Sequence, residues 1–311
     1  MNEPRRSASA PRHWQAGYAG LAILAAIACV ALVAPLHRIG FFVEEPNEGW
    51  NATHALHAFD RDLCPPPGSL IINNYPPLWF CLTGLLYRSF GDPIFPGRAV
   101  ALLAFAGTAV PIFALVRRLG ASPTASLASA LSFVAAMAGL FDGWVGLVEP
   151  QMLAHALVTI GAAMLVGTRS RKTAAAAALV MALGGLTKHT VIALPLASAV
   201  WILAYRRDLG VAFLGKGLLA AGSAVLALLV GYDETFIYNV TYPRLLSMQH
   251  LATNLASIQG LGAHCSLRGR RLESAQAERH RLDLRRAVHC GRLHHDSGVR
   301  QRARSQQQYQ F

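Results

Sequence analysis

The chain has 311 residues, of which 53% are hydrophobic and only 14% are charged, whereas soluble globular domains carry about 25% charged residues. This shortage of charge excludes an ordinary soluble domain and indicates a polytopic membrane protein. The net charge of +12 is unevenly distributed, because residues 262–311 contain 11 Arg, no Lys and 4 acidic residues. The five cysteines are scattered without metal-ligand spacing, so the sequence predicts neither a disulfide framework nor a zinc site.

The first apolar run covers residues 15–36 and follows three arginines, Arg5, Arg6 and Arg12. It is longer than the apolar part of a signal peptide, which has about 7–15 residues. A cleaved signal peptide and a lipoprotein site at Cys29 are the alternatives. We expect a first membrane span that leaves residues 1–14 in the cytoplasm.

Six further apolar runs follow, and each approaches the roughly 20 residues that cross about 30 Å of hydrocarbon. We therefore expect an all-α polytopic membrane protein with a module of about seven transmembrane helices over residues 15–231. The fourth of these six runs is short, and a tilted or partly interfacial placement is its alternative. The runs are 97–116, 124–141, 150–167, 173–187, 190–205 and 211–231.

Charges in the linkers between the runs alternate in sign along the chain. Basic linkers fall on the side of the N-terminus and acidic linkers on the other side, as the positive-inside rule requires of cytoplasmic and outer loops. The outer side then has a first loop over residues 37–96 and a last loop over residues 232–261. Four arginines on the outer side are exceptions to the rule, namely Arg38, Arg61, Arg88 and Arg98.

Two segments of the first outer loop are too short or too polar to span a membrane. The segment 75–93 begins with Pro77, which suits the first turn of a helix, and contains Trp79 and Arg88, which suit the headgroup region. The segment 48–59 is rich in alanine and histidine. We expect two interfacial helices here, with Trp79 as an interfacial anchor.

The tail, residues 262–311, is rich in Arg, His and Gln. A basic tail that binds nucleic acid or lipid is one interpretation, but the aromatic residues that usually accompany nucleic-acid binding are nearly absent. Basicity from Arg alone is also typical of out-of-frame translation of a GC-rich gene. We expect a disordered or out-of-frame tail on a truncated or frameshifted chain, and no nucleic-acid partner.

Three glutamates, Glu44, Glu45 and Glu48, directly follow the first apolar run. Carboxylates at a membrane face are costly in lipid and usually point into a cavity. They have three possible roles: solvated loop charges, metal ligands, or a general base that takes a proton from an acceptor. Composition alone favours the first role, solvated charges in a loop.

Five motifs, taken in order along residues 15–231, resemble the GT-C superfamily of polyprenyl-phosphate-dependent glycosyltransferases. The resemblance is to the branch of protein O-mannosyltransferases and lipid A aminoarabinose transferases. The motifs are EEPNEGWNA from Glu44, NNYPPLWFCLTGLLYRSFGD from Asn73, GRAVALLAFAGTAVPIFALVRRLG from Gly97, LVEPQMLAHAL from Leu147 and LGGLTKHTVIALPLA from Leu183. The resemblance implies a seven-span module whose first outer loop holds an acidic catalytic motif and two interfacial helices.

The resemblance also implies the catalytic residues. The family motif is commonly Asp followed by Glu, and here the pair reads Asn47–Glu48. An amide cannot act as a base, so the role would fall to Glu48, with Glu45 or Glu44 as its substitute. Glu149 is a second candidate acid, and a favourable charge at a helix N-terminus is its alternative role.

The donor phosphate and its sugar need further side chains. Lys188, Arg98, His189 and Arg88 are the expected phosphate ligands, because ammonium and guanidinium groups bind phosphate. For Lys188, reaching out to the headgroups is the alternative role. The sugar pocket is expected from Trp50, Tyr75 and Asn74. We expect no obligatory metal; a pair of metal ligands at His54 and His57 is the alternative.

The resulting expectation is a bacterial inner-membrane glycosyltransferase with its active site facing the periplasm. It would move a sugar from a polyprenyl phosphate to a lipid, glycan or protein acceptor by an inverting single displacement. A transporter or flippase, in which the same charges relay ions, and a catalytically impaired scaffold are the alternatives.

Two glycosylation patterns, NAT from Asn51 and NVT from Asn239, also occur. Patterns this short recur by chance, and in a bacterial chain we expect them to be unused.

Overall fold

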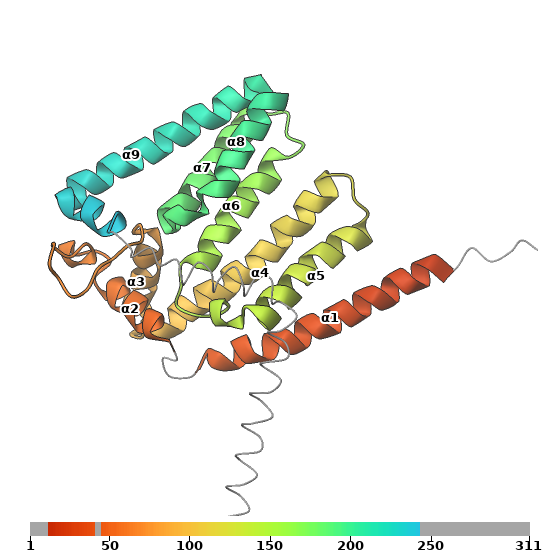
Figure 1. Ribbon diagram of the computed structural model, residues 1–311, viewed down its shortest axis with the longest axis horizontal. Helices are drawn as coiled ribbons and strands as arrows, with labels where there is room; N and C mark the ends of the chain where they lie inside the picture. Colours follow the sequence, from red (N-terminus) through yellow and green to blue (C-terminus); the bar gives the residue numbers. More distant parts are fainter. Residues whose placement is uncertain (1–11, 41–44, 243–311) are drawn as a thin grey trace, which may run out of the picture. The chain divides into compact units, whose positions relative to one another are not determined.

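The structure is a computed structural model that describes residues 12–40 and 45–242 (Figure 1). The chain divides into two units, Met1–Tyr242 and Pro243–Phe311, and only the first contains described residues. The expected tail, most of the last outer loop and Glu44 lie outside the described residues.

The described residues form helices and no strands, as the sequence predicts. Each of the seven apolar runs lies in a helix of its own. The long helices are α1 (Arg12–Arg38), α4 (Ile94–Arg118), α5 (Pro123–Leu140), α6 (Gln151–Leu165), α7 (Arg171–Thr187), α8 (Ala193–Tyr205) and α9 (Arg207–Val240). Three short 3₁₀ helices, η1 (Arg61–Leu63), η2 (Asp142–Trp144) and η3 (His189–Ile192), lie in the connections.

Four of these helices have the length and hydropathy needed to cross a membrane: Gly17–Arg38 within α1, and α4, α5 and α9. The helices α6 and α8 are apolar but have 15 and 13 residues, and α7 has 17. At 1.5 Å per residue they are shorter than the hydrocarbon core. The structure therefore supports a multi-pass membrane protein, and four spans follow from length and composition.

Both segments predicted as interfacial helices are helical. The first is α2 (Pro46–Leu56), which begins with a proline, and the second is α3 (Leu78–Phe90), which ends at Gly91 with a positive φ of 73°. The expectation for Trp79 is wrong, because its side chain is fully buried. It packs with Phe80, Leu63 and neighbouring apolar side chains in a cluster between α3, α4 and the segment that follows α2. This apolar cluster, and not the headgroup region, surrounds the indole ring.

The helices pack both against chain neighbours and against helices further along the chain (Figure 1). Helix α6 lies against α4 and α7, α7 also contacts α9, and α1 contacts α5. The contact between α6 and α7 is close, because both helices present small residues there. A Cβ atom on Gly161 would lie 2.9 Å from the carbonyl oxygen of Ala177 and 2.5 Å from Cγ of Met181.

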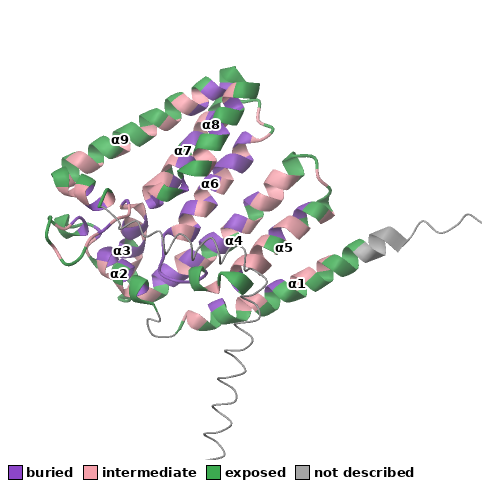
Figure 2. Cartoon of the chain, viewed as in Figure 1, coloured by how far each residue is buried: buried purple, intermediate pink, exposed green. Residues whose placement is uncertain are grey.

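Burial falls off from the centre of this unit to its edges (Figure 2). The buried residues gather on α2, α3, α4, α6 and α7, whereas α1 and α9 are largely exposed along their length. Only 6% of the apolar window of α9 is buried. Its exposed residues include large apolar ones such as Leu218 and Val230. So much exposed apolar surface requires apolar surroundings, which a bilayer provides.

The close approach of α6 and α7 predicts that Gly161→Ala destabilises the fold. The new methyl group meets backbone that cannot move cheaply, and we expect a loss of about 1–3 kcal/mol, or several degrees in Tm. Gly185→Ala in α7 is the control, because a Cβ there has no neighbour within 4 Å. Thermal unfolding in detergent measures both variants, and an equal Tm for the two would contradict this packing.

Candidate functional site

Two buried charged pairs lie where the segment between α1 and α4 meets the ends of the long helices. The first pair joins Glu48 of α2 to Arg98 near the start of α4. Arg98 donates from Nε to Oε1 at 2.8 Å and from Nη2 to Oε2 at 2.6 Å. Neither side chain has any exposed surface. This two-pronged geometry is the strongest form of ion pair between protein side chains.

The Glu48–Arg98 pair also holds backbone from two other segments. The N–H of Val148 donates to Oε1 of Glu48 at 3.0 Å, and Arg98 donates from Nη1 to the carbonyl oxygen of Arg38 at 2.5 Å. Asn51, one turn after Glu48 on α2, donates to the carbonyl oxygen of Val148 at 2.7 Å. Both backbone groups of Val148 are therefore bound by side chains of α2.

Arg38 extends this network at the end of α1. Its Nη1 donates to the carbonyl oxygen of Asp142 at 2.9 Å, and its guanidinium lies 3.6 Å from the Asp142 carboxylate. The ends of α1, α2 and α4 and the turn before α6 are thus joined through charged hydrogen bonds. This network fixes the turn that contains Val148, and with it the position of Glu149, the residue that follows Val148.

The second pair is Glu149 with Lys188. Glu149 precedes Pro150 at the start of α6, and Lys188 caps the end of α7. The Nζ of Lys188 lies 3.8 Å from Oε2 of Glu149, 4.6 Å from the ring centre of Tyr75 and 5.9 Å from that of Trp144. Aromatic faces at these distances attract an ammonium group. We call Glu149, Lys188, Tyr75 and Trp144 the outer cluster.

Glu149 is held less tightly than Glu48. Its Oε2 is buried and has no hydrogen-bond partner, whereas both oxygens of Glu48 accept hydrogen bonds. Burial raises the pKa of Glu149, while the Lys188 charge and the Asn51 amide oppose that rise. A buried carboxylate with a raised pKa and an oxygen that is bound only by a loose ion pair has the properties of a proton acceptor.

The geometry assigns different roles to the predicted catalytic residues. A carboxylate that is fully enclosed by a guanidinium and a backbone N–H cannot readily approach an acceptor, so Glu48 and Arg98 act as a structural pair here. The expected pairing of a Glu48 base with an Arg98 phosphate ligand does not fit this arrangement. Glu45 is exposed at the N-cap of α2, and its charge raises the pKa of Glu149.

Four predicted site residues remain. Two of them, His189 and Asn74, are chain neighbours of outer-cluster residues. His189 follows Lys188 in the chain and is half-buried, as is Asn74 next to Tyr75. Trp50 is exposed and donates from Nε1 to the carbonyl oxygen of Ile72 at 3.1 Å, so it holds the loop. Arg88 is exposed at the end of α3, where its guanidinium lies 4.3 Å from the ring centre of Phe59.

An apolar groove of about 570 Å³ lies between α7, α8 and α9. Its lining is almost entirely aliphatic and aromatic, with Met181, Leu186, Phe213 and Phe236 among its side chains. Pro76 and His189 line it too, and each is the chain neighbour of an outer-cluster residue. One part of the groove lining is therefore adjacent in the chain to the outer cluster.

The histidines predicted as possible metal ligands do not form a metal site in the described part of the chain. No group of three or more His, Cys, Asp or Glu side chains there is arranged to hold a metal ion. His54 is buried between the rings of Trp50 and Phe80. Burial lowers its pKa to about 4, so the imidazole is neutral at pH 7.

Three residues of this region were missed by the sequence analysis as parts of the site. Asn51 was seen only within a glycosylation pattern, Arg38 only as an exception to the charge rule, and Trp144 not at all. Arg38 did carry a signal, because an arginine at the end of an apolar run on the outer side needs a partner. Nothing in the sequence around Trp144 marks it as a neighbour of Lys188.

The enclosed pair predicts a large loss of stability for Glu48→Gln. The amide keeps the shape of the side chain but leaves Arg98 buried without its counter-charge, which costs about 3–5 kcal/mol. The control is Asp208→Asn, which breaks the exposed Arg206–Asp208 pair at 3.6 Å and should cost at most about 1 kcal/mol. Chemical unfolding of the two variants provides the comparison, and equal losses would rule out the structural role.

Adding Arg98→Met to Glu48→Gln should cost less than the sum of the two single changes, because the second removes the charge that the first leaves unpaired.

Comparison with models of protein families, with curated proteins and with solved structures gives no match for this chain.

Proposed function

We propose that this protein is a membrane glycosyltransferase that takes its sugar from a polyprenyl phosphate on the outer face of the membrane. The observation that carries the proposal is the outer cluster, in which a buried carboxylate and a cation meet beside an apolar groove. A lipid-linked sugar phosphate needs these three features together: an apolar channel, a cation for phosphate and a base for the acceptor.

The membrane arrangement belongs to the proposal. All seven long helices would cross, with the N-terminus in the cytoplasm and α2 and α3 in the outer interface of a bacterial inner membrane. The short α7 has cationic side chains at both ends, Arg171 and Lys172 at its start and Lys188 at its end. Arg171 and Lys172 are exposed, and long cationic side chains of this kind reach the headgroups from a short span, which supports a crossing by α7.

The donor would lie along the groove with its phosphate at Lys188. The isoprenoid chain is apolar and flexible, and it matches the aliphatic lining between α7, α8 and α9. The phosphate would replace Glu149 as the partner of Lys188, since the present contact is a loose one at 3.8 Å. Tyr75 and Trp144 would keep the ammonium group in place during the exchange, and His189 is the second candidate ligand.

In the reaction, an oxygen or nitrogen of the acceptor forms a bond to the anomeric carbon from the face opposite the phosphate. The bond between that carbon and the phosphate oxygen breaks, and the electron pair leaves with the polyprenyl phosphate. Lys188 stabilises the charge that develops on the departing phosphate. Glu149 accepts the proton of the acceptor, and a single displacement of this kind inverts the anomeric centre.

Glu48 and Arg98 would support the site without touching the substrates. They fix the turn at Val148, and this turn places Glu149 one residue later. Catalytic groups need such rigid support to keep their geometry. The same proposal includes a transferred sugar, an acceptor that receives it and a sugar pocket to which Trp50 and Asn74 contribute.

Binding of undecaprenyl phosphate, the lipid product, tests the donor site without knowledge of the sugar. At a concentration of about 100 Kd it should stabilise the protein by about 2.7 kcal/mol, which thermal unfolding detects. Lys188→Met should abolish this shift, whereas Lys216→Met in α9 should retain it. No stabilisation of the unchanged protein by undecaprenyl phosphate would contradict the proposal.

Glu149→Gln should lower sugar transfer by about 10²–10⁴-fold, because the amide cannot accept a proton. Transfer is measured in membranes with a panel of undecaprenyl-phosphate sugars, and Asp62→Asn, at an exposed acid of the same outer loop, is the control. Since the pKa of Glu149 is raised, kcat/KM should be lost as pH falls through a value above that of an ordinary carboxyl group. Transfer by Glu149→Gln at the unchanged rate would remove Glu149 as the base.

A further inference from the structure

Helix α9 is interrupted near its outer end. Asp233 has φ 52° and ψ −145°, and it is the one residue other than glycine with a positive φ in the described part of the chain. Residues other than glycine rarely adopt this backbone conformation, whereas glycine adopts it freely. The residues after it, 234–242, are therefore set at an angle to the rest of α9 and must be held there by other contacts.

Phe236 is buried among these residues and lines the apolar groove. The hydrogen bonds that hold them to the loop come from a second buried side chain, Asn239. Its Oδ1 accepts from the N–H of Asn73 at 2.9 Å, and its Nδ2 donates to the carbonyl oxygen of Pro65 at 2.8 Å. Asn239 has no exposed surface. It connects the end of α9 to both ends of the loop 63–75, across more than 160 residues of sequence.

The loop leads from Asn239 to the outer cluster. Asn73 donates from Nδ2 to the carbonyl oxygen of Leu63 at 3.1 Å and accepts from the N–H of Tyr75 at 3.1 Å. The ring of Tyr75 in turn lies 4.6 Å from Nζ of Lys188. The end of α9 and Lys188 are therefore linked through an unbroken series of contacts.

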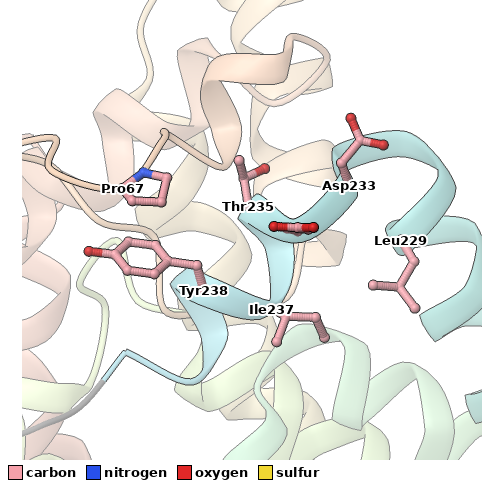
Figure 3. Close-up of a pocket in the computed structure, with 7 residues that line it drawn as sticks. Pro67, Leu229, Asp233, Thr235, Ile237 and Tyr238 are labelled. Atoms are coloured by element: carbon pink, nitrogen blue, oxygen red, sulfur yellow. The ribbon is translucent and has the colours of Figure 1, made fainter.

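Weaker contacts lie around the break itself. An open pocket of about 1010 Å³ separates the loop from the end of α9, and Pro67 lies beside Thr235 and Tyr238 there (Figure 3). Among the described residues, an ion pair between Arg61 and Asp233 crosses it at 4.0 Å, and both side chains are largely exposed. Exposed pairs of this kind contribute little, so the hydrogen bonds of Asn239 are the stronger polar connection between the loop and the end of α9.

We propose that residues 234–242 form a latch that turns about Asp233 and holds the loop 63–75, and with it Tyr75, against Lys188. In the latched state Asn239 is buried in the loop. In the open state residue 233 adopts helical dihedral angles, α9 continues straight and the loop is released. The latch stands independently of the proposed glycosyl transfer, because it rests on backbone geometry and hydrogen bonds alone.

Cys64 provides a reporter for the latch. It is buried in the loop, next to the carbonyl group that Asn239 binds. Burial raises the pKa of its thiol to about 11, so it reacts slowly with maleimides. Release of the loop exposes the thiol and increases the thiolate fraction, and both effects speed the reaction.

The experiment measures maleimide labelling of the full chain in which Cys29, Cys81, Cys265 and Cys290 are replaced by alanine. Asp233→Ala and Asp233→Gly are a matched pair, since both remove the contact with Arg61 and differ only in the backbone conformations they allow. Alanine favours the straight helix and glycine permits the break. We expect Asp233→Ala to label about tenfold faster than Asp233→Gly.

Asn239→Ala should also accelerate labelling of Cys64, by about tenfold or more. A second reporter separates opening of the loop from unfolding: Ala156→Cys in the otherwise cysteine-free chain, at a buried position of α6. Faster labelling at Cys64 with unchanged protection at the second reporter supports the latch. Equal labelling of Cys64 in the two Asp233 variants, or acceleration only together with the second reporter, overturns it.

Discussion

The enclosed pair between Glu48 and Arg98 is the interaction on which this unit depends. Removing two charges from water is costly, and the cost is offset only when every hydrogen-bonding group of the pair finds a partner. Here those partners are backbone groups of Val148 and Arg38. The need to satisfy both charges therefore fixes four segments of the chain in one arrangement.

The location of this pair explains how Glu149 is held in place within a short turn. The residues from Asp142 to Glu149 contain little regular structure beyond η2. Two side chains of α2 nevertheless bind both backbone groups of Val148. The turn held in this way presents Glu149 towards the end of α7.

Much of the fold could be predicted from the sequence, because apolar runs and helix-terminating residues are local signals. All seven runs are helices, and α2 and α3 lie where the outer loop predicts them. The helix lengths were overestimated for α6 and α8, because an apolar run continues past Leu165 into a turn and begins before Ala193 in η3.

The site was less predictable, because its contacts join residues far apart in the sequence. Glu48 and Arg98 were both selected as functional, but their separation of 50 residues gave no indication that they bind each other. The four arginines that are exceptions to the positive-inside rule were the available indication of such contacts. Each of them has a partner in the structure: Arg38 with Asp142, Arg61 with Asp233, Arg88 with Phe59 and Arg98 with Glu48.

The two amides at the start of the glycosylation patterns have a consequence for production of the protein in eukaryotic cells. Asn51 and Asn239 are both buried, and each uses its Nδ2 to bind a backbone carbonyl. An oligosaccharide attaches to that same nitrogen, so the folded chain offers neither acceptor to the secretory machinery. A glycan found at either position would mark molecules that were modified before they folded.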